Sequence, residues 1–418
     1  MLSWLVFIWS LLVSTYFGLR FTQTKKREES VFHLMVFMML FPTTSFMVPY
    51  FTKFQLVYYY PFFAFLCLYY IVHSYRKKRI NRTFFLYCTS ATIFFTAYLI
   101  YNQLMGRSYE YIDLLKDVKP FVLIALAYAF YLLAGKYLEA YFYSKHWQKV
   151  LKWHFWVSTV IFLSMKVGKL HLLLSSDPYY LNKPVRYLDL GTYSICAFLI
   201  YRITRKEKLR SIEMLYCFLP LIYSGNRTLF IALAVFYAVF SVFTASLKTN
   251  VYRLLIFGTL LSAFVYVVGK AEKSSPLYRF QSLMSVDEIS RILSNRYSPF
   301  TDTLEDFEQP TDYIFGLGPG RTYYIPWFEY RSNIKNHNIY LDNFYLSMYG
   351  KYGVFALVFI WFLVCYLREV SDRKFLLYYG IFLFTIGLTN CFSHQFTFLW
   401  LLIMPIMTKK AEGSLPSS

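Results

Sequence analysis

The segment FGLGPGRTYYIPWFEYRSNIKNHNIYLDNFYLSMYGKYG, residues 315–353, is a long polar stretch set between strongly apolar ones. It opens with Gly316, Gly318 and Gly320, and Arg321 follows directly. Glycines at this spacing let backbone amides approach a ligand closely, and a basic residue beside them suits a phosphate group. We therefore expect any chemistry of this chain to lie in this segment.

The composition of the whole chain is typical of a membrane protein. Of its 418 residues, 57% are apolar, 22% are aromatic and 16% are charged, and its mean hydropathy is +0.39. A soluble domain of this length does not combine these values. We therefore expect an all-α polytopic integral membrane protein that forms a single domain over residues 1–418.

The apolar runs predict about thirteen transmembrane helices, with a range of about 12–14, each near the length that a bilayer needs. The first run is kept as a membrane helix because no small-residue cleavage site of a signal peptide stands out behind it. The expected spans are residues 2–19, 31–48, 55–72, 83–101, 120–139, 150–166, 187–201, 211–224, 227–246, 251–268, 345–367, 375–390 and 394–408.

The net charge of +20 falls in short basic clusters between these spans. Such clusters mark the cytoplasmic ends of membrane helices, so they indicate topology and not a nucleic-acid partner. Placing all of them inside gives a cytoplasmic C-terminus and, with about thirteen spans, an external N-terminus. Residues 269–344 then form one large outward-facing loop, in which we expect two or three short amphipathic helices.

Cysteine, histidine and carboxylate patterns give little sign of a metal centre. The six cysteines lie in or beside apolar runs without CxxC spacing, and the seven histidines are scattered. We therefore expect no disulfide, metal or cofactor. Glu110, Asp113 and Asp117 recur at helical spacing, which predicts a solvated acidic face, with a divalent-cation site as the alternative.

Arg227 is the most unusual cation of the sequence. It lies in the phrase YSGNRT, residues 223–228, which interrupts two apolar runs without leaving room for a loop. A charge at the membrane boundary on the translocated side costs about 2.5–3.5 kcal/mol by insertion scales, so we expect something to compensate it. Two interpretations remain for the Arg227 side chain. It reaches lipid headgroups or a carboxylate, or its guanidinium group binds a phosphate or diphosphate through two hydrogen bonds.

The large loop carries further arginines and two candidate bases. Each arginine alone is best explained as a solvated surface charge, but as a set in an outward loop they indicate an anionic ligand. His337 is the natural general base for activating a hydroxyl group, and Asp342 is the competing candidate. The arginines are Arg279, Arg291, Arg296 and Arg321.

These features in this order resemble the bacterial O-antigen polymerase and ligase superfamily, which contains the Wzy-type polymerases and WaaL-type ligases. The resemblance covers residues 211–367. It rests on the Ser-x-x-Arg-Thr phrase at 224–228, the long outward loop, Phe-Gly-x-Gly-x-Gly at 315–320, the His/Asp-Asn-x-Tyr-Leu phrases at 337–346 and Tyr352-Gly353.

The resemblance implies a C-type glycosyltransferase of the inner membrane that acts at the periplasmic face on undecaprenyl-diphosphate-linked oligosaccharides, without a nucleotide sugar. Arg227 and Arg321 look like the family's phosphate-contacting arginines. His337 looks like its histidine by identity, whereas spacing from Gly353 points to Asp342. The further expected binding residues are Arg279, Arg296, Gly318, Gly320, Asn338, Tyr340 and Asn343.

The mechanism that follows is inverting glycosyl transfer, in which arginines hold the diphosphate and the base accepts the proton of an acceptor hydroxyl. The Asp-Asn phrase at 342–343 favours a polymerase of repeat units over a ligase that transfers glycan to lipid A core. A flippase or other transporter is the third alternative, but transporters place binding groups at mid-membrane. Membrane lipids, a chain-length regulator and a flippase are the expected partners.

Overall fold

The computed structural model describes residues 2–40, 49–77, 80–107, 109–167, 186–244, 259, 262, 264–273, 275–326 and 336–409. These residues are mostly helical, and their one sheet consists of two short antiparallel strands, β1 (Tyr323–Tyr324) and β2 (His337–Asn338). The expectation of an all-α protein is therefore confirmed for the described part of the chain.

Four helical stretches among the described residues are long and apolar enough to cross a membrane. They are Arg82–Leu104, Tyr111–Tyr143, Arg227–Thr244 and Phe344–Val370. Leu190–Thr204, Ser211–Ser224 and Thr397–Thr408 are apolar but shorter. By length and hydropathy the structure thus supports four spans rather than the full expected number, and the expected span 251–268 falls largely outside the described residues.

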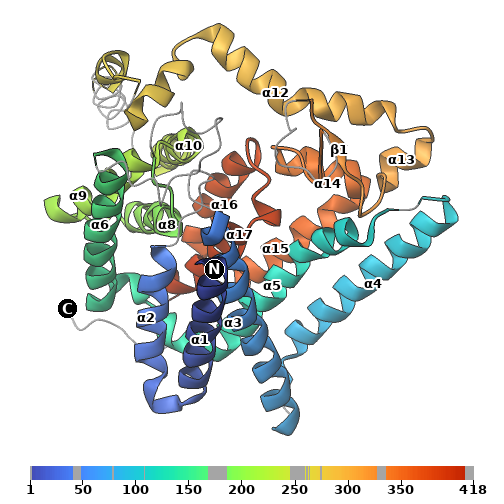
Figure 1. The fold of residues 1–418 in the computed structure, drawn as a ribbon, viewed down its shortest axis with the longest axis horizontal. Helices are drawn as coiled ribbons and strands as arrows, with labels where there is room; N and C mark the ends of the chain where they lie inside the picture. The colour runs from blue at the N-terminus through green and yellow to red at the C-terminus, as the bar shows by residue number, and fades with distance from the viewer. Residues whose placement is uncertain are drawn as a thin grey trace.

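In the first half of the chain, helix α5 packs against α2, α3 and α4, and the helices α6, α8, α9 and α10 form a group beside them (Figure 1). Asn81 starts α4 by accepting a hydrogen bond from the Phe84 amide, and Asp189 starts α8 by accepting one from the Thr192 amide. The helices are α1 (Leu2–Thr22), η1 (Thr24–Lys26), α2 (Arg27–Met39), α3 (Pro49–Arg76), α4 (Arg82–Leu104), α5 (Tyr111–Leu138), η2 (Tyr141–Tyr143), α6 (Lys145–Lys166), α8 (Leu190–Thr204), α9 (Ser211–Ser224) and α10 (Arg227–Thr244).

The second half places a layer across one end of the helices and then returns to the centre (Figure 1). The layer consists of η3 (Pro276–Leu283), α12 (Val286–Glu305) and α13 (Pro310–Phe315), and it extends from α10 to α14. The elements that follow are α14 (Phe344–Tyr352), η4 (Gly353–Phe355), α15 (Ala356–Val370), α16 (Arg373–Gly387), η5 (Phe392–His394), α17 (Phe396–Ile403) and η6 (Met404–Thr408).

Helix α17 lies at the centre of the molecule, and α4 lies at its edge. Every residue from 398 to 404 is buried, and the Trp400 indole donates to the hydroxyl of Ser194 in α8 at 2.7 Å. By contrast, Phe85, Ile93 and Ile100 of α4 are more than half exposed. Apolar side chains directed outward along a helix of this length suit a lipid environment.

Candidate functional site

The break between α9 and α10 brings Arg227 to the start of a helix. Gly225 has a φ of 53° and ends α9, and Asn226 then caps α10 by accepting a hydrogen bond from the Leu229 amide at 3.3 Å. The left-handed conformation suits glycine because it lacks a side chain. Arg227 is therefore the first residue of α10 and directly follows this turn.

Three arginines from three elements surround this turn and the turn after α16. Arg227 of α10 donates to the hydroxyl of Ser282, and Arg279 of η3 donates to the Gly225 carbonyl at 3.3 Å. Arg296 of α12 donates to the Thr389 carbonyl. The hydroxyl groups of Thr228 and Thr389 lie 3.0 Å apart and join the two turns. We call Arg227, Arg279 and Arg296 the arginine cluster.

The arginine cluster carries more positive than negative charge. Arg227 is partly buried and is repelled by Arg296, while Glu288 attracts it. Arg296 forms an ion pair with Asp342 at 3.4 Å and also donates to its backbone carbonyl. Among the described residues, the hydrogen bond to Ser282 is the one that the Arg227 side chain makes. Like charges held together in this way favour an anionic ligand between them.

The other two arginines of the expected set lie outside the cluster. Arg321 pairs with Asp306 beside β1, at the far end of α12 from α10 (Figure 1). Arg291 is exposed and pairs with Glu288 at 2.8 Å. The structure thus brings together Arg227, Arg279 and Arg296, but it does not bring Arg321 to them.

The two candidate bases have different surroundings. The carboxylate of Asp342 is half exposed and is held next to the arginine cluster by Arg296. His337 lies in β2 opposite Tyr324, and the two rings pack edge to face with centroids 5.6 Å apart. Asn338 donates to the Tyr340 carbonyl, and Asn343 caps α14 and donates to the Leu388 carbonyl at 3.0 Å. Both asparagines therefore shape the chain around the candidate bases.

The glycine-rich loop has its amides bonded within the protein. Gly316, Gly318 and Gly320 all have positive φ, between 70° and 93°. The Gly318 amide donates to the Lys351 carbonyl at 2.8 Å, and the Gly320 amide donates to the Asp117 carboxylate at 2.7 Å. Their expected role as phosphate donors therefore receives no support from this geometry. The glycines instead allow the loop to pack closely against α4, α5 and α14.

Side chains from the end of α4 and from the α4–α5 connection hold this loop from the other side. Asn102 donates to the Pro319 carbonyl at 3.2 Å, and Tyr109 donates to the Leu317 carbonyl at 2.5 Å. Arg107 forms an ion pair with the buried Asp312 at 2.5 Å. Burial works against the charge of Arg107, but this hydrogen bond and ion pair outweigh it and raise the pKa of the guanidinium.

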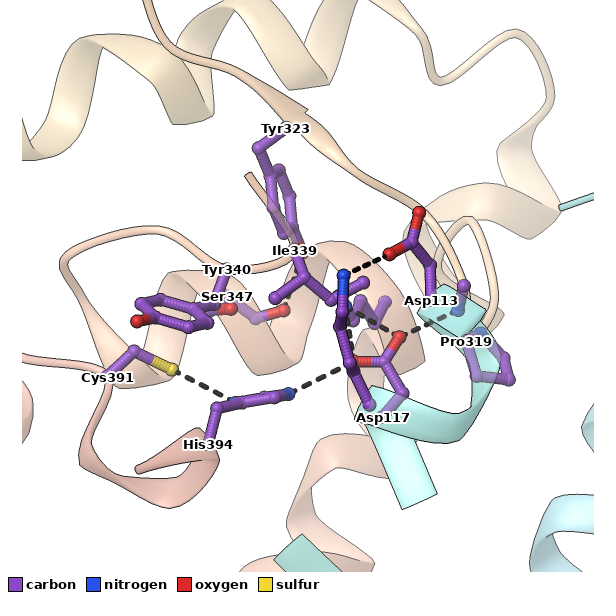
Figure 2. Close-up of polar contacts among 12 residues, drawn as sticks. Asp113, Asp117, Pro319, Tyr323, Ile339, Tyr340, Ser347, Cys391 and His394 are labelled. Carbon is purple, nitrogen blue, oxygen red and sulfur yellow. Dashed lines mark hydrogen bonds and ion pairs between the residues drawn. The ribbon is translucent and has the colours of Figure 1, made fainter. Parts of the chain in front are cut away.

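A buried polar network lies beneath the loop (Figure 2). Asp117 of α5 accepts hydrogen bonds from Lys351 of α14 at 2.5 and 2.6 Å and contacts the Nε2 atom of His394 at 3.0 Å. Asp117 and Lys351 are completely buried, and His394 nearly so. We call these three residues the buried triad. An ion pair removed from water in this way needs several partners to offset its desolvation, and Asp117 has them.

Aromatic rings and hydroxyl groups complete the surroundings of the buried triad. The Tyr340 ring packs over the His394 ring with centroids 5.4 Å apart (Figure 2). The Lys351 ammonium lies over the Tyr323 ring, 5.7 Å from the ring centroid. The Tyr323 hydroxyl donates to the Ser347 carbonyl at 2.6 Å. Burial raises the pKa of Tyr323 well above its ordinary value, so the phenol remains a donor.

The buried triad could be predicted from the sequence only in part. Asp117 belongs to the acidic series considered above, but its partner is Lys351, and Asp113 pairs with Lys116 at 2.8 Å. The described residues contain no group of three metal-ligating side chains. Lys351 and His394 were not singled out. A lysine inside the apolar run 344–370 was the available signal, because intramembrane charges are costly and need a partner.

Residues 30–409 match the profile of a protein family described as a family of unknown function, DUF6369. No curated protein matches the chain.

Proposed function

The chain belongs to the DUF6369 family, whose function is unknown, and we propose that it is an inverting glycosyltransferase of the bacterial inner membrane that polymerises surface polysaccharide. In this proposal it joins undecaprenyl-diphosphate-linked repeat units at the periplasmic face. The observation that carries the proposal is the arginine cluster, three cations from α10, η3 and α12 placed around two turns.

The arginine cluster suits the leaving group of this reaction. When a glycan is transferred from a polyprenyl diphosphate, the bond between the anomeric carbon and the diphosphate oxygen breaks, and negative charge develops on that oxygen. Guanidinium groups stabilise such charge through paired hydrogen bonds. Arg227 is held by the neutral hydroxyl of Ser282, which a diphosphate can replace. Arg296 keeps its contacts with Thr389 and Asp342 and has further N–H groups that can donate to a diphosphate.

Asp342 is the base that this geometry favours over His337. Its carboxylate lies beside the arginine cluster through the ion pair with Arg296, whereas His337 packs against Tyr324 in the small sheet. In the proposed step, the acceptor hydroxyl oxygen attacks the anomeric carbon and its proton passes to Asp342. Holding donor and acceptor in one site supplies the proximity that the reaction needs, and inversion follows from the single displacement.

The proposal is tested by glycan laddering on gels, in a strain that lacks its own copy of this gene. The wild-type chain should restore a ladder of many repeats, and Arg227→Ala should leave a single repeat on the lipid A core. Arg291→Ala is the matched control, because this arginine is exposed and pairs with Glu288 outside the cluster.

Two other outcomes would contradict the proposal. A null strain that has no glycan on the core but accumulates long lipid-linked polymer would indicate a ligase. Single units retained on the cytoplasmic leaflet would indicate a transporter, and the arginine cluster would then lose its assigned role.

A further inference from the structure

We propose that Asp117, Lys351 and His394 are positioning residues, which orient the arginine cluster and the candidate base without touching the substrate. This inference rests on the proposed function. The buried triad joins four parts of the chain that are distant in sequence: α5, the glycine-rich loop, α14 and the connection between α16 and α17.

The connection between α16 and α17, residues 388–395, links the buried triad to the arginine cluster. His394 is near its end and contacts Asp117 at 3.0 Å. Thr389 is near its start, where its carbonyl accepts from Arg296 and its hydroxyl lies 3.0 Å from that of Thr228. A change in the position of His394 therefore reaches two sides of the arginine cluster through five residues of backbone.

A second route runs through the segment that carries the candidate bases. Tyr340 lies between His337 and Asp342 in sequence, and its ring packs over His394 (Figure 2). Asn343 continues this connection, since its amide group donates to the Leu388 carbonyl at 3.0 Å. His394 thus supports both the turn that holds Arg296 and the segment that supplies Asp342.

A neutral imidazole satisfies all of these hydrogen bonds of His394. Its Nε2 atom faces the Asp117 carboxylate, which can only accept, so Nε2 carries the hydrogen. Its Nδ1 atom is then an acceptor for the hydroxyl of Ser393 at 3.1 Å and the thiol of Cys391 at 3.5 Å. Lys351 balances the charge of Asp117. The role of His394 in this arrangement is that of a hydrogen-bond donor of fixed direction.

This role predicts different results for two substitutions of His394. Glutamine can place an amide N–H near the position of Nε2 and still donate to Asp117, but it cannot titrate. Leucine fills similar space and cannot donate. We measure the affinity of the purified full-length protein for farnesyl diphosphate, a soluble isoprenyl diphosphate, together with its melting temperature in detergent.

We expect His394→Gln to bind farnesyl diphosphate within about threefold of wild type, and His394→Leu to bind on the order of tenfold to a hundredfold more weakly. His154→Leu is the matched control. His154 is also buried and pairs with a carboxylate, Asp189, at 2.8 Å, so its loss should lower the melting temperature similarly but leave affinity within about threefold.

The inference is wrong if His394→Leu keeps wild-type affinity, if His394→Gln is as damaging as His394→Leu, or if His154→Leu weakens binding equally. Failure of the proposed function has a separate signature. In that case the wild type does not bind farnesyl diphosphate, or Arg227→Ala binds it as tightly as the wild type does. Reduced affinity in Arg227→Ala with unchanged affinity in His394→Leu would refute the positioning role alone.

Discussion

Gly316 and Gly106 both have positive φ, 70° and 65°, but very different surroundings. A Cβ atom on Gly106 would meet nothing within 4 Å, whereas one on Gly316 would lie 2.5 Å from the backbone carbon of Lys351. Alanine at either position is strained by the positive φ, at a cost of about 1–3 kcal/mol. At Gly316 it must also displace backbone.

We therefore expect Gly316→Ala to lose about 1–3 kcal/mol more stability than Gly106→Ala, because of this overpacking. Thermal unfolding of the two variants in detergent measures the difference. Equal melting temperatures would show that the glycine-rich loop is not fastened against α14 as described.

Arg296 and Arg291 lie on the same helix and differ in their contacts. Arg296 reaches Thr389 and Asp342, and Arg291 pairs with Glu288 at the surface. Arg296→Ala should shorten the glycan ladder severely, because a partly buried, charge-assisted contact to a diphosphate contributes about 1.5–3 kcal/mol, or about tenfold to 150-fold in rate. Arg291→Ala should leave the ladder unchanged at matched protein levels. Equal ladders for the two variants would contradict the placement of Arg296 in the site.

Individual residues could be predicted from the sequence, but their contacts could not. Arg227 was identified because a cation beside two apolar runs needs compensation. Its surroundings could not be identified, since Ser282 lies 55 residues away and the contact between Thr228 and Thr389 spans 161 residues. The glycine-rich loop is recognisable as unusual. A sequence cannot distinguish a glycine that permits close packing from one that binds phosphate, because the residue is the same in both cases.

Helices α5 and α14 are joined by the ion pair of Asp117 and Lys351, which is fully buried at 2.5 Å. Removal of one partner leaves an uncompensated charge, so Asp117→Asn and Lys351→Met should each lose about 3–5 kcal/mol of stability. The double variant leaves no net charge at this site. It should lose much less stability than the sum of the losses in the two single variants. A double-mutant cycle of unfolding free energies measures this coupling. Additive losses would contradict a direct ion pair between the two helices.

Hydropathy predicts where the helices lie, but it does not predict where they break or which helices they contact. The run expected at 83–101 corresponds to α4, and the run expected at 345–367 corresponds to α14, η4 and α15 together. Gly353, with a φ of 54°, divides that run at a place that hydropathy does not mark. Two or three short helices are expected in 269–344, and the described residues there include the short helices η3 and α13 and the longer α12 with its 20 residues.

The whole molecule should have one orientation if the basic clusters direct it. We expect residues 269–344 outside and the C-terminus inside. Arg291→Cys should then react with a membrane-impermeant maleimide in intact bacterial cells, whereas Lys208→Cys should react only after permeabilisation. The wild-type chain, with its six native cysteines, gives the background. The reverse labelling pattern would place the arginine cluster on the cytoplasmic side and refute a periplasmic reaction.

If this chain forms glycosidic bonds between lipid-linked units, as we propose, a reconstituted system should contain the polymerised product. The purified protein is placed in liposomes with undecaprenyl-diphosphate-linked repeat units as the only glycan, and product length is measured on gels and by mass spectrometry. We predict chains of several repeats with release of undecaprenyl diphosphate from the wild type, and none from Arg227→Ala. Units that stay single with the wild type, or that are transferred only when lipid A core is added, would show that the chain is not a polymerase.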